Sequence, residues 1–155
     1  MKPVIVLAFA NDKDKYLPMI ARESKSLFNS LWDLHDTGCI QVHREENATL
    51  KRIFDVFTRY RDRVAMFHYG GHAGGSHLKL ETETGENEPA HASGLAKLMG
   101  QQEQLRLVFL NGCATLPQVK RLLDSGVKAV IATSVPVSDK RAVEFAEQFY
   151  YALAT

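Results

Sequence analysis

Residues 67–75 read FHYGGHAGG, an apolar run followed by two glycine pairs that flank His72 and Ala73. The apolar run is typical of a buried strand, and the glycines let the backbone turn sharply and approach another segment closely. Residues that bind or react concentrate in loops carried by a rigid scaffold, so a histidine in this loop is a candidate for chemistry. The stretch therefore predicts a strand that ends in a functional loop.

A second stretch repeats this arrangement, because residues 107–115 read LVFLNGCAT and deliver Cys113 next to a glycine. A cysteine thiolate attacks carbonyl carbon, and a neighbouring histidine promotes the thiolate and later protonates the leaving amine. A helix expected to begin at Pro117 would favour the thiolate further through the dipole of its amino terminus. The alternative is that Cys113 is a small buried core residue and His72 an ordinary loop histidine.

Length and composition predict one domain over residues 1–155, since 45% of the 155 residues are apolar. The net charge is +1 and the basic residues are scattered, so we expect no nucleic-acid partner. Two cysteines without metal-type spacing favour a reducing, cytoplasmic setting. The apolar run at 4–10 is too short for a membrane span, and no membrane association is expected.

Hydrophobic patterns predict strands alternating with helices along the chain. Apolar runs indicate five strands, at residues 4–9, 39–43, 64–69, 105–110 and 129–132. Helical spacing indicates helices over 16–34, 49–61, 93–99 and 117–124 and from a cap at Ser138 or Asp139 almost to the end. Residues 77–87 indicate an exposed hairpin or flap beside the His72 loop. This alternation predicts an α/β sandwich, three layers around a mostly parallel sheet.

In a parallel sheet, ligand sites form at the carboxyl ends of the strands, and the loops after those strands share one rim. If strands 64–69 and 105–110 are neighbours, His72 and Cys113 lie side by side there. Backbone N–H groups at Cys113 and near Ala73 would then stabilise an oxyanion. Asn11 and Asp12 follow the first strand to the same rim, where they contact a substrate or form a turn.

Other reactive side chains carry weaker signals. His68, His72 and His77 lie on a strand and a glycine loop rather than on one helix face, so no metal site is expected. We expect His68 to be partly buried and to orient the loop, and Cys39 to pack beneath the 16–34 helix. No glycine-rich nucleotide motif is present, and no cofactor is predicted. A receiver-like ligand site after the first strand would need acidic partners for Asp12 that the sequence does not supply.

Residues 64–153 resemble the CHAT domains of the caspase-like cysteine peptidase clan, which includes caspases, metacaspases, separases and gingipains. The resemblance is carried by residues 67–75 and 107–115 and by the segment VIATSVPVSD at 130–139. It implies a caspase-like fold and a cysteine endopeptidase in which Cys113 is the nucleophile and His72 the general acid/base. The chain departs from caspases, which have Gln-Ala before the nucleophile, and from the many relatives with glycine at the position of Ala73. These departures argue against caspase-type specificity for aspartate.

Asp139 resembles an aspartate that helps separases and other CHAT proteins bind a basic residue before the scissile bond, which implies cleavage after basic residues. Its alternative role is a helix cap, and both roles are compatible. The resemblance also implies a further strand and groove loops after residue 153, so we expect an open sheet edge that a partner or a second copy covers. The protein would be the effector module of a larger prokaryotic signalling or defence protein that acts on a protein or peptide. The alternative is a non-catalytic interaction module.

Overall fold

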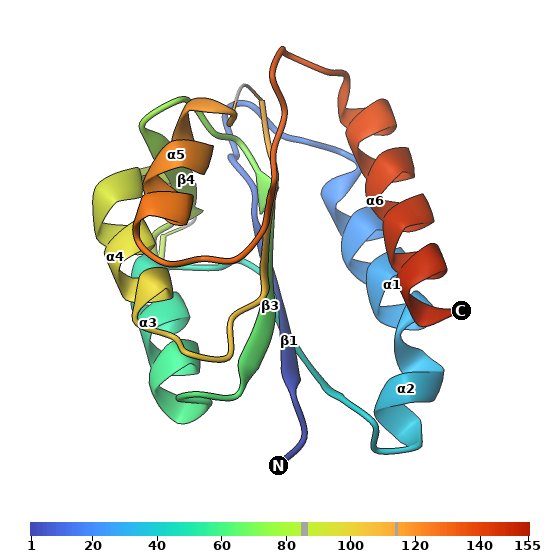
Figure 1. Cartoon of the computed structure of the whole chain (residues 1–155). Helices are drawn as coiled ribbons and strands as arrows, with labels where there is room; N and C mark the ends of the chain where they lie inside the picture. The colour runs from blue at the N-terminus through green and yellow to red at the C-terminus, as the bar shows by residue number, and fades with distance from the viewer. Residues whose placement is uncertain (85–86, 114) are drawn as a thin grey trace.

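A five-stranded parallel sheet forms the centre of the molecule, whose computed structural model describes residues 1–84, 87–113 and 115–155. The strands lie in the order β2-β1-β3-β6-β7, and every neighbouring pair is parallel. Their bounds are β1 Val4–Ala10, β2 Gln41–Glu45, β3 Val64–Gly71, β6 Leu107–Asn111 and β7 Val130–Ile131. Figure 1 shows the sheet between two layers of helices. The predicted α/β sandwich is confirmed.

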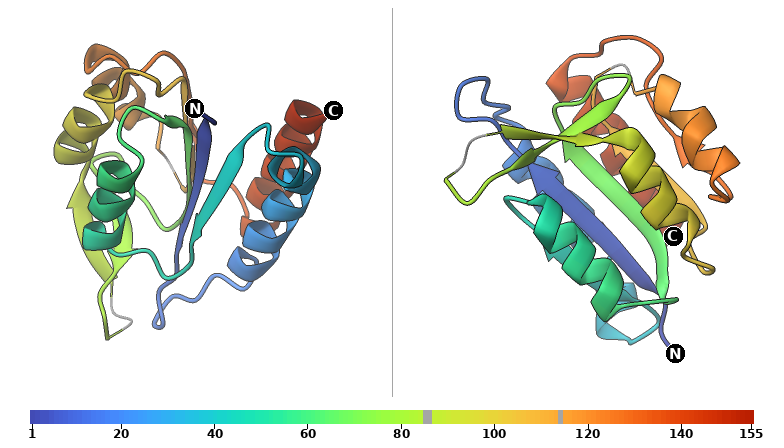
Figure 2. Two further views of the ribbon diagram at one scale, coloured as in Figure 1. Left: turned by 90° about the horizontal axis from the view of Figure 1, so that it is seen from below. Right: turned by 90° about the vertical axis from the view of Figure 1, so that its left-hand side faces the viewer.

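Helices cover both faces of the sheet. On one face lie α1 Ile20–Ser30, α2 Trp32–Asp36 and α6 Asp139–Ala154, and on the other lie α3 Leu50–Arg59, α4 Ala92–Gly100 and α5 Pro117–Asp124 (Figures 1 and 2). Alternate β1 residues belong to two different cores, with Val6 packing toward α3 and Leu7 toward α1. This explains why the β1 sequence is continuously apolar rather than alternating.

A two-stranded antiparallel hairpin lies on the α3 and α4 side of the sheet, formed by β4 His77–Glu81 and β5 Asn87–His91 (Figure 2). The hairpin was expected to be exposed, but Leu78 and Leu80 are buried in the same core as α3 and α4. The backbone N–H of Lys79 donates to the carbonyl oxygen of His72 at 3.0 Å. The hairpin therefore packs as part of the domain and supports the His72 loop.

The predicted helix over 16–34 is wrong in two respects, because α1 begins only at Ile20 and a separate short α2 follows it. The side chain of Asn11 accepts a hydrogen bond from Leu17 N at 2.8 Å and donates one to Leu17 O at 2.9 Å. These bonds hold residues 11–17 in a loop, so α1 begins after them, at Ile20. Cys39 was expected to be packed beneath this helix, but it is exposed in the turn before β2.

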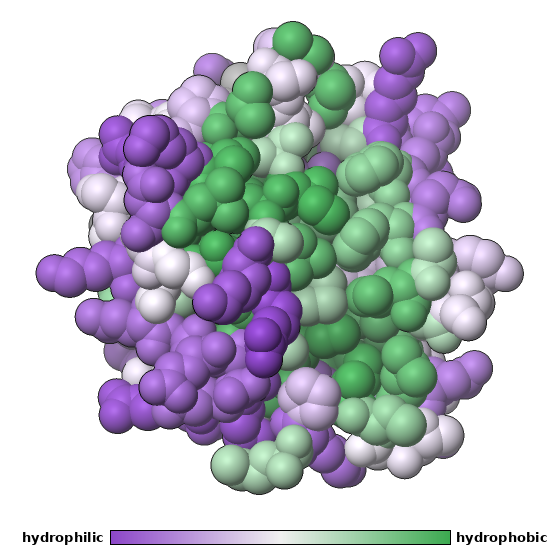
Figure 3. All heavy atoms as spheres, in the orientation of Figure 1, coloured by the Kyte–Doolittle hydropathy of each residue, from purple (hydrophilic) through white to green (hydrophobic). Residues whose placement is uncertain are grey.

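The β7 edge of the sheet carries an apolar surface. Val130 and Ile131 are half-buried, and no described strand pairs with the outer side of β7. Nearby, Val135 is 59% exposed and Phe145 on α6 is 56% exposed. Figure 3 shows apolar side chains gathered across this face of the molecule. Over the described ranges, no helix has both the length and the apolar composition that crossing a membrane requires.

Candidate active site

The ends of β3 and β6 bring the two predicted reactive side chains to one place. These strands are hydrogen-bonded neighbours, and Gly70 on β3 stands opposite Asn111 on β6. His72 and Cys113 each follow two residues after this pair, and both line a cavity of about 100 Å³. We call it the Cys113 cavity, and its lining comprises Leu17, Ile20, Glu23, Gly71, His72, Asn111, Gly112, Cys113, Val137, Asp139 and Ala142.

Glycines allow the two loops to touch. A Cβ atom on Gly112 would lie 2.8 Å from the Cβ of Ala73 and 2.8 Å from the carbonyl oxygen of Gly71. A Cβ atom on Gly71 would lie 2.5 Å from the carbonyl oxygen of Ala10 on β1. Real Cβ atoms do not approach backbone so closely, so larger residues would force the loops apart. The glycines noticed in the sequence therefore act through close packing.

The His72 loop is fixed from beneath. The buried hydroxyl of Tyr69 lies within hydrogen-bond distance of the carbonyl oxygens of His72 and Lys79, the second at 2.6 Å, and shares its one proton between them. Burial is the largest influence on this phenol and raises the pKa of Tyr69, so the hydroxyl keeps its proton as a donor. The amide of Gln118 on α5 donates to the carbonyl oxygen of Gly74 at 2.6 Å. The half-buried His72 ring itself donates through Nε2 to the carbonyl oxygen of Lys15.

The Cys113 loop is held by threonines from two elements. The hydroxyl of Thr115 donates to the carbonyl oxygen of Leu110 at 3.2 Å, and the hydroxyl of Thr133 donates to the carbonyl oxygen of Gly112. Cys113 is exposed, and its Sγ lies 3.9 Å from the carbonyl oxygen of Val137. The alternative of a buried core cysteine is therefore wrong, and the thiol is accessible to a reactant.

Asp139 lines the same cavity at the start of α6. Its Oδ2 accepts a hydrogen bond from Met19 N, at 3.1 Å. The helix cap is Ser138, whose hydroxyl accepts from Arg141 N at 3.3 Å. The capping role that was an alternative for Asp139 thus belongs to its neighbour Ser138, and Asp139 instead binds Met19 N and lines the Cys113 cavity.

Asn11 and Asp12 form the turn after β1. Asn11 lines a cavity of about 200 Å³ that shares Ile20 with the Cys113 cavity. Asp12 Oδ1 accepts from Asp14 N at 2.9 Å, and this bond is the largest influence lowering the pKa of Asp12. The charge of His72 lowers it to a smaller extent, consistent with Asp12 lying near the loop. The turn role is observed, and substrate contact by either residue stays a prediction.

Sequence reasoning missed the polar network beneath the cavity. Glu23 Oε1 accepts from His68 Nε2 and from Asn111 Nδ2, both at 2.7 Å. His68 was expected to be partly buried, but its side chain is 0% exposed and that of Glu23 is 2% exposed. One signal could have revealed Glu23, since it lies three residues after Ile20 and four before Leu27, within the apolar stripe of α1. A carboxylate in a buried stripe requires polar partners.

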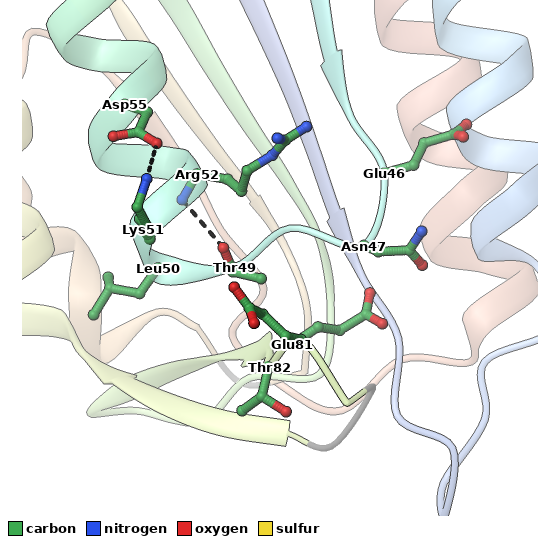
Figure 4. Close-up of a pocket in the computed structure, with 10 residues that line it drawn as sticks. Glu46, Asn47, Thr49, Leu50, Lys51, Arg52, Asp55, Glu81 and Thr82 are labelled. Carbon is green, nitrogen blue, oxygen red and sulfur yellow. Dashed lines mark hydrogen bonds and ion pairs between the residues drawn. The ribbon is translucent and has the colours of Figure 1, made fainter.

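A larger hollow of about 630 Å³ lies elsewhere on the rim, between the start of α3 and the end of β4 (Figure 4). We call it the α3 hollow, and its lining comprises Glu46, Asn47, Thr49, Leu50, Lys51, Arg52, Asp55, Glu81, Thr82 and Glu83. Figure 4 shows Lys51 turned toward Asp55, with which it forms an ion pair at 2.7 Å. This lining contains neither a cysteine nor a histidine. Within the described part of the chain, three side chains of metal-binding type nowhere converge.

The CHAT domain model matches residues 2–155, which is almost the whole chain. The chain belongs to the CHAT family. Another CHAT protein, the Roc-COR-CHAT protease of Runella zeae, is 29% identical over 72 residues. The match covers 45% of this chain and 8% of that relative, so the chain corresponds to a small part of the relative's length.

Two solved structures share the fold of this CHAT domain. A secreted C11 cysteine protease of Bacteroides thetaiotaomicron, solved with an irreversible peptide inhibitor, has a TM-score of 0.59 and 9% identity. That similarity covers 99% of this chain and 60% of the protease. Chaetomium thermophilum Raptor has a TM-score of 0.52 and 9% identity over 80% of this chain and 14% of Raptor. At such identity the likeness shows the fold, which is that of caspase-like cysteine proteases.

Proposed function

We propose that this CHAT domain is a cysteine endopeptidase in which Cys113 is the nucleophile and His72 the general acid and base. The supporting observation is that both side chains line one cavity on the carboxyl rim, in loops that touch at Gly112. The thiolate of Cys113 bonds to the peptide carbonyl carbon, and the imidazolium of His72 protonates the departing amine. Water, deprotonated by His72, then hydrolyses the thioester and restores the thiol.

The backbone N–H groups of Cys113 and Ala73 are the proposed oxyanion donors. They belong to the two loops that approach closely at Gly112, which supports their acting together on the carbonyl that Cys113 would attack. Fixed donors of this kind stabilise negative charge as it develops on the carbonyl oxygen. Asn11 and Asp12 would contact the peptide from the neighbouring part of the rim, where the two cavities share Ile20.

The proposed specificity is for a basic residue before the scissile bond. Two carboxylates, Asp139 and the buried Glu23, line the Cys113 cavity, and its lining contains neither lysine nor arginine. Leu17, Ile20 and Ala142 line the same cavity and would contact the methylene stem of a lysine or arginine. A cationic end group would gain two carboxylate acceptors, and hydrogen bonds between charged groups are the stronger ones.

The orientation of His72 favours a second candidate function. Nε2 of the ring donates to the carbonyl oxygen of Lys15 and is not engaged with Cys113 in this structure. Catalysis would require the ring to leave Lys15 or to act through its other nitrogen when substrate binds, a change that free enzymes often show. A non-catalytic caspase-like interaction module would need no such change.

The proposed setting is a cytoplasmic effector module of a larger signalling or defence protein. The match to only 8% of the Runella zeae protease supports this, because there a CHAT region accompanies much additional sequence. Regulatory segments and a protein substrate would be the partners of the module.

Digestion of a peptide library made from a denatured proteome tests the endopeptidase. We expect the wild-type domain to generate new peptide ends, enriched for lysine or arginine before the cut, and both Cys113→Ala and His72→Ala to generate none. Asp139→Asn should cut more slowly with a weakened preference for basic residues. Cleavage by Cys113→Ala at the wild-type rate would contradict the proposal, and inertness of a folded wild-type domain would favour the interaction module.

A further inference from the structure

A buried network joins the strands that carry the two reactive loops. Glu23 on α1 accepts hydrogen bonds at a single oxygen, Oε1, from His68 on β3 and Asn111 on β6. Asn111 also donates to the carbonyl oxygen of Ala142 on α6, at 3.1 Å. One carboxylate thus connects two helices and two strands directly beneath the Cys113 cavity, which both Glu23 and Asn111 line.

The network is oriented by its surroundings. The His68 ring packs against the rings of Phe9, Phe109 and Tyr150, with centroid distances of 5.7, 4.7 and 5.4 Å. His68 Nδ1 is buried and has no hydrogen-bond partner among the described residues, so Nε2 is the ring atom that serves Glu23. Nearby polar groups from α6 are Asp139, which lines the cavity, and the buried Tyr150, whose pKa is raised by burial and by the charge of Glu23.

Such a network is a poor way to gain stability, because replacing a buried ion pair by apolar side chains is often neutral or favourable. It is better suited to fixing positions, since each hydrogen bond has one geometry and an unsatisfied buried partner is costly. Two members of the network lie just before the reactive residues in the sequence. Asn111 lies two residues before Cys113, and His68 lies four residues before His72.

We propose that Glu23 is a positioning residue, which holds Asn111 and His68 so that the Cys113 and His72 loops leave the sheet in reactive alignment. This inference rests on the proposed function. The charge of Glu23 is not what the alignment needs, but its Oε1 acceptor is. Removing the acceptor would free the Asn111 amide and let the start of the Cys113 loop move.

A second histidine–glutamate pair supplies a matched control. His43 Nε2 and Glu45 Oε1 on β2 are 2.6 Å apart, and the Glu45 side chain is 7% exposed. Glu45 also pairs with Arg52 at 3.0 Å. This pair resembles the Glu23–His68 pair in chemistry, but it lines a different hollow that contains neither His72 nor Cys113. Replacing Glu45 by alanine therefore tests for general effects of removing a largely buried glutamate.

The experiment measures alkylation of Cys113 and Cys39 by iodoacetamide at pH 7, followed by peptide mass spectrometry. Both cysteines are exposed, so their rate ratio within one protein corrects for changes in reagent and global opening. We expect Glu23→Ala to lower the ratio of Cys113 to Cys39 toward one, a loss of about tenfold, because a displaced Cys113 loop would take the thiol away from His72. Glu23→Gln, which keeps the Oε1 acceptor, should restore the ratio. Glu45→Ala should leave it unchanged.

Asn111→Ala provides a second route, because it leaves the Glu23–His68 bond in place and should lower the ratio even if Glu23→Ala folds poorly. Wild-type ratios in both alanine variants would overturn the positioning role while leaving the proposed peptidase intact. An equal loss in Glu45→Ala, or failure of Glu23→Gln to restore the ratio, would also overturn it. A wild-type ratio near one, unaffected by His72→Ala, would instead overturn the proposed function and this inference with it.

Discussion

Two hollows lie on the same rim of the sheet, and the one with the smaller volume contains the candidate reactive side chains. The α3 hollow is about 630 Å³ and the Cys113 cavity about 100 Å³, yet it is the smaller one that contains the histidine and the cysteine. Lys51 and Asp55 of the α3 hollow form an ion pair at the surface (Figure 4). Exposed pairs of this kind contribute little and orient nothing beyond themselves.

The difference lies in what fixes each lining. In the Cys113 cavity the backbone around Gly71 and Gly112 leaves no room for a Cβ atom. The Glu23 side chain is 2% exposed and is held by hydrogen bonds. Preorganised groups are what catalysis requires, because fixing them beforehand removes the entropy of alignment from the reaction. Close packing and buried hydrogen bonds in the lining, rather than volume, therefore distinguish the candidate active site.

The largest expected effect separates the two hollows by chemistry. Cys113→Ala should lower peptide cleavage by at least about a thousandfold, because removal of a nucleophile leaves only the binding groups. Asp55→Asn, in the α3 hollow, should leave the cleavage rate unchanged. Both rates are measured on one peptide that the wild-type domain cuts. Comparable losses in the two variants would break the distinction between the hollows.

A second effect tests the close approach of the loops. Gly112→Ala should cost about 1–3 kcal/mol of folding free energy, because its Cβ would overlap Ala73 and the carbonyl oxygen of Gly71. It should also slow alkylation of Cys113. Gly94→Ala is the matched control, since nothing lies within 4 Å of the new Cβ and alanine favours helix, by up to about 1 kcal/mol. Urea unfolding measures the free energy of unfolding of both variants. Equal values for Gly112→Ala and Gly94→Ala would contradict the packing account.

A smaller effect concerns Glu81 in the α3 hollow, where burial is the largest influence and raises the pKa of the carboxyl. A raised folded-state pKa means that ionised Glu81 opposes folding at neutral pH and that this cost disappears as pH falls through that pKa. Glu81→Gln keeps an acceptor for Asn11 N and should raise Tm by a few degrees at most at pH 7. The gain should shrink toward pH 4. A gain in Tm that grows as the pH falls would contradict a raised pKa of Glu81.

Much of the fold follows from local patterns in the sequence. Proline at the first position and glycine after the last fix α5 at Pro117–Asp124, as predicted. The continuous apolar runs of β1, β3 and β6 predict strands that are buried on both faces, and right-handed crossovers then leave few arrangements. His72 and Cys113 were predictable as neighbours because the carboxyl ends of parallel strands share one rim.

Tertiary contacts account for what the sequence did not reveal. The Asn11 side chain holds Leu17 in a loop, so the helix predicted from residue 16 begins later than the helical spacing indicated. Glu23 lies on a stripe of apolar residues, and only the folded chain shows that His68 and Asn111 satisfy it. Exposure of Cys39 likewise depends on the turn before β2, where neither helix α1 nor α2 covers it.

The most direct test of the central claim compares the two cysteines within one protein. Alkylation by iodoacetamide at pH 7 should modify Cys113 faster than Cys39 in the wild-type domain by about tenfold or more, because in the proposed mechanism His72 promotes the Cys113 thiolate. In His72→Ala the two rates should become similar, while circular dichroism shows an unchanged fold. Equal rates in the wild-type domain, or a fast Cys113 that does not depend on His72, would contradict the account.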